Sequence, residues 1–135
     1  MIIFSFDFGL KKIGIAIGNT LTLHSRPFDI IYPKTKKERY IYIDKLITEW
    51  HPITIVVGIP NIYDEFGNIQ LSYLNCKKFS NQLKERYKIP IVLINEHNSS
   101  IEAQEYLNNK DVKNDDAIAA ALILNRYFES KKINY

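Results

Sequence analysis

The sequence has a single cysteine, Cys76, among its 135 residues. One thiol forms neither a disulfide within the chain nor a cysteine-based zinc cluster. A chain without disulfides suits a reducing compartment. No apolar run approaches the roughly 18 residues of a membrane-spanning helix, and no basic segment with an apolar run and a cleavage site opens the chain. We therefore expect a cytoplasmic protein that makes no contact with a membrane.

The chain also lacks a strong excess of either charge. Its 18 basic and 15 acidic residues give a formal net charge of +3. Such a weakly basic chain permits a polyanionic partner such as nucleic acid, but a solvated, lysine-rich surface explains the charge equally well. No internal repeat, low-complexity tract or linker interrupts the sequence, and its length suits one domain over residues 1–135.

What the chain does contain is an apolar β-hairpin over residues 2–19. The period of two puts Asp7 on one face of the first strand with Ile3 and Ser5, opposite a row of aromatic side chains. In the second strand, three small residues leave one face nearly bare: Gly14, Ala16 and Gly18. A carboxylate in so apolar a strand is costly unless it is paired, hydrogen-bonded or bound to metal. Asp7 therefore either caps the following turn or belongs to a site.

Strands and helices alternate along the rest of the chain. A strand over about residues 26–32 leads to a helix with capping-box spacing between Thr35 and Glu38, which Pro52 ends. The β-branched run 53–59 is typical of a parallel strand covered on both faces. Residues 60–70 form a loop, in which we assign Asp64 and Glu65 to solvent. Then follow a helix to about residue 87 that buries Cys76, Phe79 and Leu83, a strand over 89–94, a short helix from Ser99 to Leu107, and a last helix from Asp115.

This order of elements predicts the topology of an α/β fold. Right-handed crossovers give a five-stranded mixed sheet in the order 3-2-1-4-5, with helices on both faces and only the second strand antiparallel to its neighbours. Ligands bind beyond the carboxyl ends of parallel strands, where we expect Asp7, Glu96 and one residue of the Asp115–Asp116 pair. Each acid also has a structural explanation, since Glu96 follows a strand as a loop residue and the aspartates favour a helix N-terminus.

Five segments, in order along nearly the whole chain, resemble the YqgF family: FDFGLKKIGIAIGN, SRPF, IVVGIP with a later FGN, NEHNSSIEA and DDAIAAALILNRYF. Proteins of that family are described as pre-16S ribosomal RNA nucleases and as Holliday junction resolvase-like proteins. The resemblance implies a ribonuclease H-like fold and an acidic triad of Asp7, Glu96 and Asp116.

One segment departs from the family pattern. Where the family has Asp-Glu-Arg-Leu-Thr-Thr, this chain has residues 95–100, NEHNSS. The glutamate and the hydroxyl groups are kept, whereas an arginine that would clamp a phosphate in bidentate fashion is replaced by His97. The departure puts substrate affinity in doubt more than metal binding.

The resemblance implies a metal-dependent nuclease that hydrolyses phosphodiester bonds, in processing of the 5′ end of pre-16S ribosomal RNA. Clustered carboxylates suit Mg²⁺ or Mn²⁺, and two such ions about 4 Å apart activate a water and stabilise the leaving oxygen. In this scheme Asp7 bridges both ions, and Glu96 and Asp116 each complete one side. The candidate substrate contacts are Lys11, Lys12, Arg26, Ser99 and Ser100. For each of the three cations taken singly, a solvated position on the surface is the simpler explanation.

Other functions stay open beside this one. A Holliday junction resolvase acting on branched DNA would use the same site but needs a dimer, and the sequence does not decide between a monomer and a weak dimer. A non-catalytic nucleic-acid-binding module would tolerate loss of the three acids, yet all are present. An actin-like ATPase or sugar kinase shares the Asp-x-Gly hairpin of residues 7–9 but needs two lobes, and 135 residues supply one.

Overall fold

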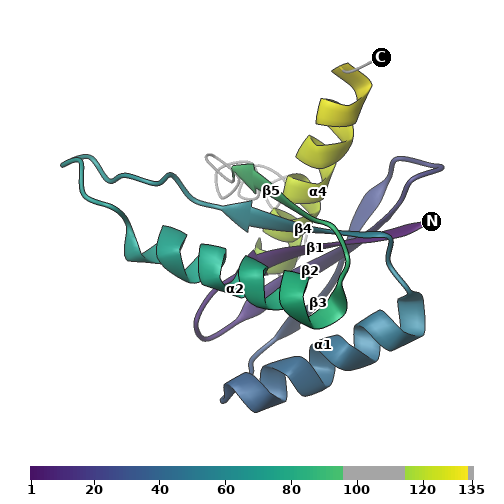
Figure 1. The fold of residues 1–135 in the computed structure, drawn as a ribbon. Helices are drawn as coiled ribbons and strands as arrows, with labels where there is room; N and C mark the ends of the chain where they lie inside the picture. The colour runs from purple at the N-terminus through teal and green to yellow at the C-terminus, as the bar shows by residue number, and fades with distance from the viewer. Residues whose placement is uncertain (96–114, 134–135) are drawn as a thin grey trace.

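A five-stranded mixed sheet forms the centre of the computed structural model (Figure 1). The strands are β1 (Ile2–Phe8), β2 (Ile13–Asn19), β3 (Ser25–Ile31), β4 (Thr54–Ile59) and β5 (Ile91–Asn95), in the spatial order β3-β2-β1-β4-β5. β2 runs antiparallel to β1 and β3, whereas β4 runs parallel to β1 and β5. The predicted topology is confirmed.

The structure describes residues 1–95 and 115–133. The short helix predicted from Ser99 to Leu107 and the predicted site residues Glu96, Ser99 and Ser100 lie outside these ranges. Over the described ranges, none of the helices combines the length and apolar character needed to cross a membrane.

The aromatic face of β1 builds the larger core, under α1 (Lys36–Trp50) and α2 (Leu71–Tyr87). Phe4 and Phe6 are fully buried, and the ring of Phe6 meets that of Phe79 from α2 edge-on, with centroids 5.9 Å apart. Figure 1 shows both helices on the same side of the sheet. As predicted, α2 buries Cys76, whose Sγ lies 4.0 Å from the carbonyl oxygen of Phe8.

Helix α4 (Asp115–Ile133) covers the opposite face, so the prediction of helices on both faces is confirmed (Figure 1). Its apolar residues, among them Ile123 and Leu124, pack on Ile3 of β1 and Val56 of β4. The bare face of β2 is what lets the helix approach: a Cβ added to Gly14 would lie 2.2 Å from a backbone oxygen of α4.

The ends of α1 follow local rules. At its start the hydroxyl Oγ1 of Thr35 accepts a hydrogen bond from the amide of Glu38 at 3.1 Å, as the capping-box spacing predicts. At its end His51 takes a left-handed conformation with φ 47°, and its amide donates to the carbonyl of Ile47. The helix thus ends just before Pro52, which disfavours a helical conformation at the residue preceding it.

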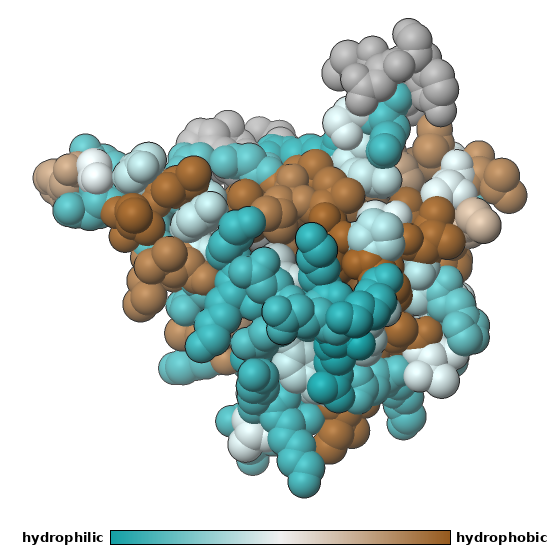
Figure 2. Space-filling view, in the orientation of Figure 1, coloured by the Kyte–Doolittle hydropathy of each residue, from teal (hydrophilic) through white to brown (hydrophobic). Residues whose placement is uncertain are grey.

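The segment predicted as a loop over 60–70 is a short, ordered hairpin that projects from the body of the molecule (Figure 1). Tyr63 pairs with Ile69, and the carboxylate of Asp64 accepts the amides of Phe66 and Asn68 at 2.8 and 2.9 Å. Assigning Asp64 to solvent was therefore wrong, because its side chain closes the turn. Figure 2 shows apolar atoms on this arm, at left, and a largely hydrophilic surface over α1 and α2.

Candidate active site

Asp7 lies next to the carboxyl end of β1, directly opposite Gly14 of β2. Residues paired across two strands project from the same face of a sheet. Because the missing side chain of Gly14 would point at α4, Asp7 also projects from the face that α4 covers. The register predicted from the sequence, with Asp7 on the face of Ile3, is thus the one observed.

Asp116 stands in the first turn of α4, at the same glycine. Its carbonyl oxygen and carbon lie 2.2 and 2.5 Å from the position that a Cβ of Gly14 would occupy. Gly14 therefore separates two predicted acids, with Asp7 beside it in the sheet and Asp116 directly above it. The side chain of Asp116 is 25% exposed and its Oδ2 is buried, so the carboxylate is largely withdrawn from water.

Lys12 forms an ion pair with this acid. Its Nζ lies 2.7 Å from Oδ2 of Asp116. The turn that joins β1 to β2 sets the position of Lys12, because the amide of Gly9 donates to the Lys12 carbonyl at 2.9 Å. An ammonium group here offsets the repulsion between neighbouring carboxylates. The predicted contact of Lys12 with a substrate phosphate stays a prediction.

The other predicted cations lie differently. Lys11 is exposed in the same turn as Lys12. Arg26 pairs with Ile17 near the start of β3, and its guanidinium carbon lies 5.8 Å from the centroid of the Phe28 ring. The structure therefore places Arg26 on the sheet face opposite Asp7 and does not bring the two together.

Two residues that the sequence did not single out hold the end of β5, from which the chain continues to Glu96. Arg126 of α4 donates through NH1 to the backbone carbonyl of Asn95 at 2.9 Å. The side-chain Nδ2 of Asn95 donates to Oδ1 of Asn61 at 2.9 Å. Asn95 stands where the family pattern has an aspartate. No signal in the sequence indicates that Arg126 of α4 contacts the end of β5, because the contact joins residues 31 positions apart.

The donor chemistry of the site fits a hard divalent cation. Asp7 and Asp116 supply carboxylate oxygens on one face of the sheet, which are the ligands that Mg²⁺ and Mn²⁺ prefer. Within residues 1–95 and 115–133, no three His, Cys, Asp or Glu side chains gather closely enough to hold a metal ion. Glu96, the third predicted acid, lies outside those ranges.

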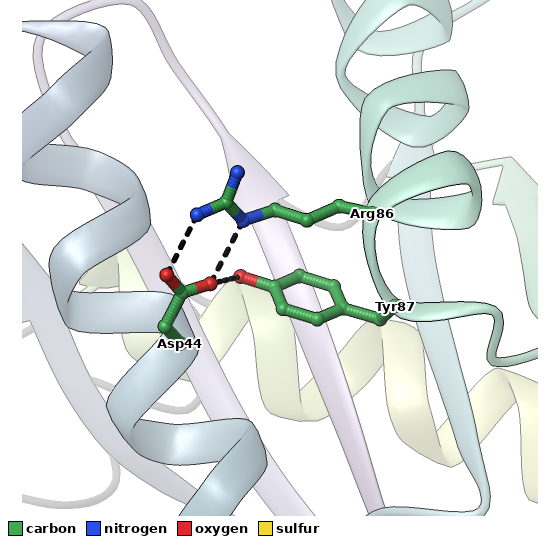
Figure 3. Close-up of polar contacts among 3 residues, drawn as sticks. All are labelled: Asp44, Arg86 and Tyr87. Atoms are coloured by element: carbon green, nitrogen blue, oxygen red, sulfur yellow. Dashed lines mark hydrogen bonds and ion pairs between the residues drawn. The ribbon is translucent and has the colours of Figure 1, made fainter.

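Shifted pKa values also mark a polar cluster of Asp44, Arg86 and Tyr87, which joins α1 to α2 (Figure 3). Arg86 donates to both carboxylate oxygens of Asp44, at 2.8 and 2.7 Å, and the Tyr87 hydroxyl donates at 2.6 Å. The Arg86 hydrogen bonds lower the pKa of Asp44, while burial raises that of Tyr87. The cluster stands by the end of α2 that leads into β5, so we assign it to helix packing.

Comparison with known proteins identifies close relatives. Residues 1–130 match the model of a family named RuvX and described as Holliday junction resolvase. A Bordetella avium protein named "Putative pre-16S rRNA nuclease" is 46% identical over 125 residues, which cover 93% of this chain and 92% of that protein. A Paraburkholderia phytofirmans protein of the same name is 36% identical over 127 residues, covering 93% and 86%.

Solved structures share the fold at low sequence identity. RuvC of T. thermophilus in complex with a Holliday junction substrate matches with a TM-score of 0.63 at 11% identity, over 98% of this chain and 96% of that one. The fowlpox virus Holliday junction resolvase matches with a TM-score of 0.58 at 19% identity, over 96% and 99%. The predicted ribonuclease H-like fold is confirmed.

Proposed function

The chain belongs to the RuvX family, and we propose that it is a metal-dependent nuclease that hydrolyses phosphodiester bonds in precursor 16S ribosomal RNA in the cytoplasm. The observation that carries the proposal is the position of Asp7 and Asp116 on either side of Gly14, at the carboxyl end of β1. These two acids, from segments more than 100 residues apart, lie next to the same glycine on one sheet face. Relatives named for this activity, at 44–46% identity, support the choice of substrate.

Asp7, Glu96 and Asp116 would hold Mg²⁺ or Mn²⁺, and we propose two ions with Asp7 as the shared ligand. When bound, such ions lower the pKa of a water and neutralise charge on the leaving oxygen. The chain itself fixes the ligands: strand pairing orients Asp7, and the docking of α4 on Gly14 sets the position of Asp116. Lys12 Nζ lies 2.7 Å from the Asp116 carboxylate and reduces the repulsion between the acids.

The direct test is cleavage by the purified protein. We would incubate it with Mn²⁺ and an end-labelled RNA that spans the 5′ end of the 16S sequence, in parallel with the Asp7→Asn variant. The proposal expects cleavage by the wild-type protein and none above background by the variant. Equal cleavage by both proteins would refute the assignment of Asp7.

A second candidate, cleavage of branched DNA, is favoured by the description of the matched family as Holliday junction resolvase. A labelled four-way DNA junction placed beside the RNA distinguishes the two. A resolvase has to cut two strands symmetrically, so cleavage of the junction should accompany a dimer in light scattering. Cleavage of RNA by a monomer, with the junction intact, would favour the ribosomal substrate.

A further inference from the structure

A pocket of about 210 Å³ lies between α1 and α2, beside the end of β1 that carries Asp7. Its lining residues combine cations, amides and apolar side chains, and none of those described is acidic: Phe8, Leu10, Lys36, Arg39, Asn75, Lys78, Phe79 and Gln82. The volume is below the roughly 300 Å³ at which pockets for whole small molecules begin. Its size and charge suit a single anionic group.

Arg39 is the most constrained of the cations. Its guanidinium carbon lies 5.0 Å from the centroid of the Phe8 ring and 5.8 Å from that of Phe79. The two rings themselves stack with centroids 4.4 Å apart, so they form a rigid wall against which the guanidinium rests. Over the described part of the chain, the Nε of Arg39 is buried and finds no hydrogen-bond partner. The half-buried guanidinium also hydrogen-bonds the hydroxyl of Tyr40. The Nε–H itself still lacks an acceptor, which an anion in the pocket would supply.

Two lysines add donors to the pocket beside Arg39. Lys36 stands on α1 and Lys78 on α2, so positive charge reaches the pocket from both walls. Gln82 accepts the hydroxyl of Tyr40 through Oε1 at 2.7 Å, which leaves its amide nitrogen to donate. Arginine and lysine donors converging on one small pocket are the usual partners of a phosphate group.

The pocket is next to the candidate active site along the backbone but on the other face of the sheet. Phe8 follows Asp7 directly, and their Cα atoms are about 3.8 Å apart. Side chains alternate along a strand, so Asp7 projects toward α4 while Phe8 projects into the pocket. A ligand that crosses the end of β1 would therefore meet both.

We propose that this pocket binds a backbone phosphate of the nucleic-acid strand, neighbouring the phosphodiester presented to Asp7. The inference rests on the proposed function for the identity of the ligand, and it adds a substrate-binding residue set that includes Lys36, Arg39 and Lys78. The strand would pass over the end of β1 from the α4 side to the α1–α2 side.

A charge-matched pair of variants tests the proposal. The pocket variant carries Lys36→Gln and Lys78→Gln, and the control carries Lys45→Gln and Lys84→Gln, which remove the same charge from the same two helices outside the pocket. Binding of a fluorescent single-stranded RNA is measured by anisotropy in EDTA, where no cleavage occurs. We expect about tenfold weaker binding for the pocket variant and a change of less than about twofold for the control. Equal weakening in both, or none in either, would overturn the proposal.

Arg39 offers a second readout that needs neither RNA nor activity. The Nε–H signal of Arg39, assigned with an Arg39→Lys variant, is followed by NMR while inorganic phosphate is added. The proposal expects this signal to move in the wild-type protein and in Asp7→Asn, and to stay in place in the pocket variant. A signal that phosphate leaves unmoved in the wild type refutes the pocket. If phosphate moves it but no nucleic acid is cleaved, the pocket stands and the proposed nuclease function fails.

Discussion

Lys12 and Asp116 are paired at 2.7 Å, so an ammonium group already contacts one of the two carboxylates that β1 and α4 bring to the same face. A cation that binds these acids has to share Asp116 with Lys12. The Lys12→Gln variant should therefore bind Mn²⁺ about fivefold more tightly, because one nearby positive charge is removed. Calorimetric titration measures this, with exposed Lys11→Gln as the control. Unchanged or weaker affinity in Lys12→Gln would mean that the pair does not compete with the metal.

Asp7→Asn should separate metal binding from folding. Removing one of two crowded carboxylates relieves repulsion, so the variant should be at least as stable as the wild type in EDTA. A ligand at a hundredfold excess over its Kd stabilises the folded state by about 2.7 kcal/mol, and the wild type should gain Tm from Mn²⁺ while the variant gains little. Thermal unfolding with and without Mn²⁺ checks both. If Asp7→Asn melts lower in EDTA and still cuts RNA, Asp7 is structural.

Gly14→Ala should be strongly destabilising. The new Cβ would meet the Asp116 carbonyl oxygen at 2.2 Å, and backbone on both sides has to move, at a cost of about 3 kcal/mol. Gly67→Ala is the matched control, since Gly67 has φ +82° but nothing within 4 Å, and about 1 kcal/mol of backbone strain is expected. Urea unfolding compares the two. A smaller loss at Gly14 than at Gly67 would argue against the close packing of α4.

The Asp44–Arg86 pair predicts a pH dependence of stability. Arg86 lowers the pKa of Asp44 in the folded state, so the stabilisation is present above the unfolded pKa of about 4 and is lost as pH falls through the lower, folded value. Urea unfolding between pH 2 and pH 6 should show a steeper loss for the wild type than for Asp44→Asn. The difference should shrink in 1 M salt, because both side chains are partly exposed. Parallel pH profiles would leave the pair without an energetic role.

The strand order and the face of Asp7 were predictable because both follow from short-range periodicity and a handedness rule. The close packing of a helix on Gly14 and Gly18 was not predictable, because nothing in the sequence of β2 indicates which helix covers it. The position of Arg39 on Phe8 and the contact of Arg126 with Asn95 were likewise hidden, because each joins residues about 30 positions apart. The prediction for Asp64 failed over a short range: we assigned this loop residue to solvent, but its carboxylate accepts two amides of its own turn.

Gly14 also bears on how errors in strand pairing are rejected during folding. A slip of β2 by one residue against β1 would turn the isoleucine face of β2 toward α4 and the glycine face away. The first turn of α4, whose backbone takes the space of a side chain at Gly14, would then collide with Ile13 or Ile15. In a hairpin with the wrong register, α4 would not pack on β2, and the strands would stay free to re-pair. The close packing of α4 on Gly14 thus favours the observed register of β1 and β2.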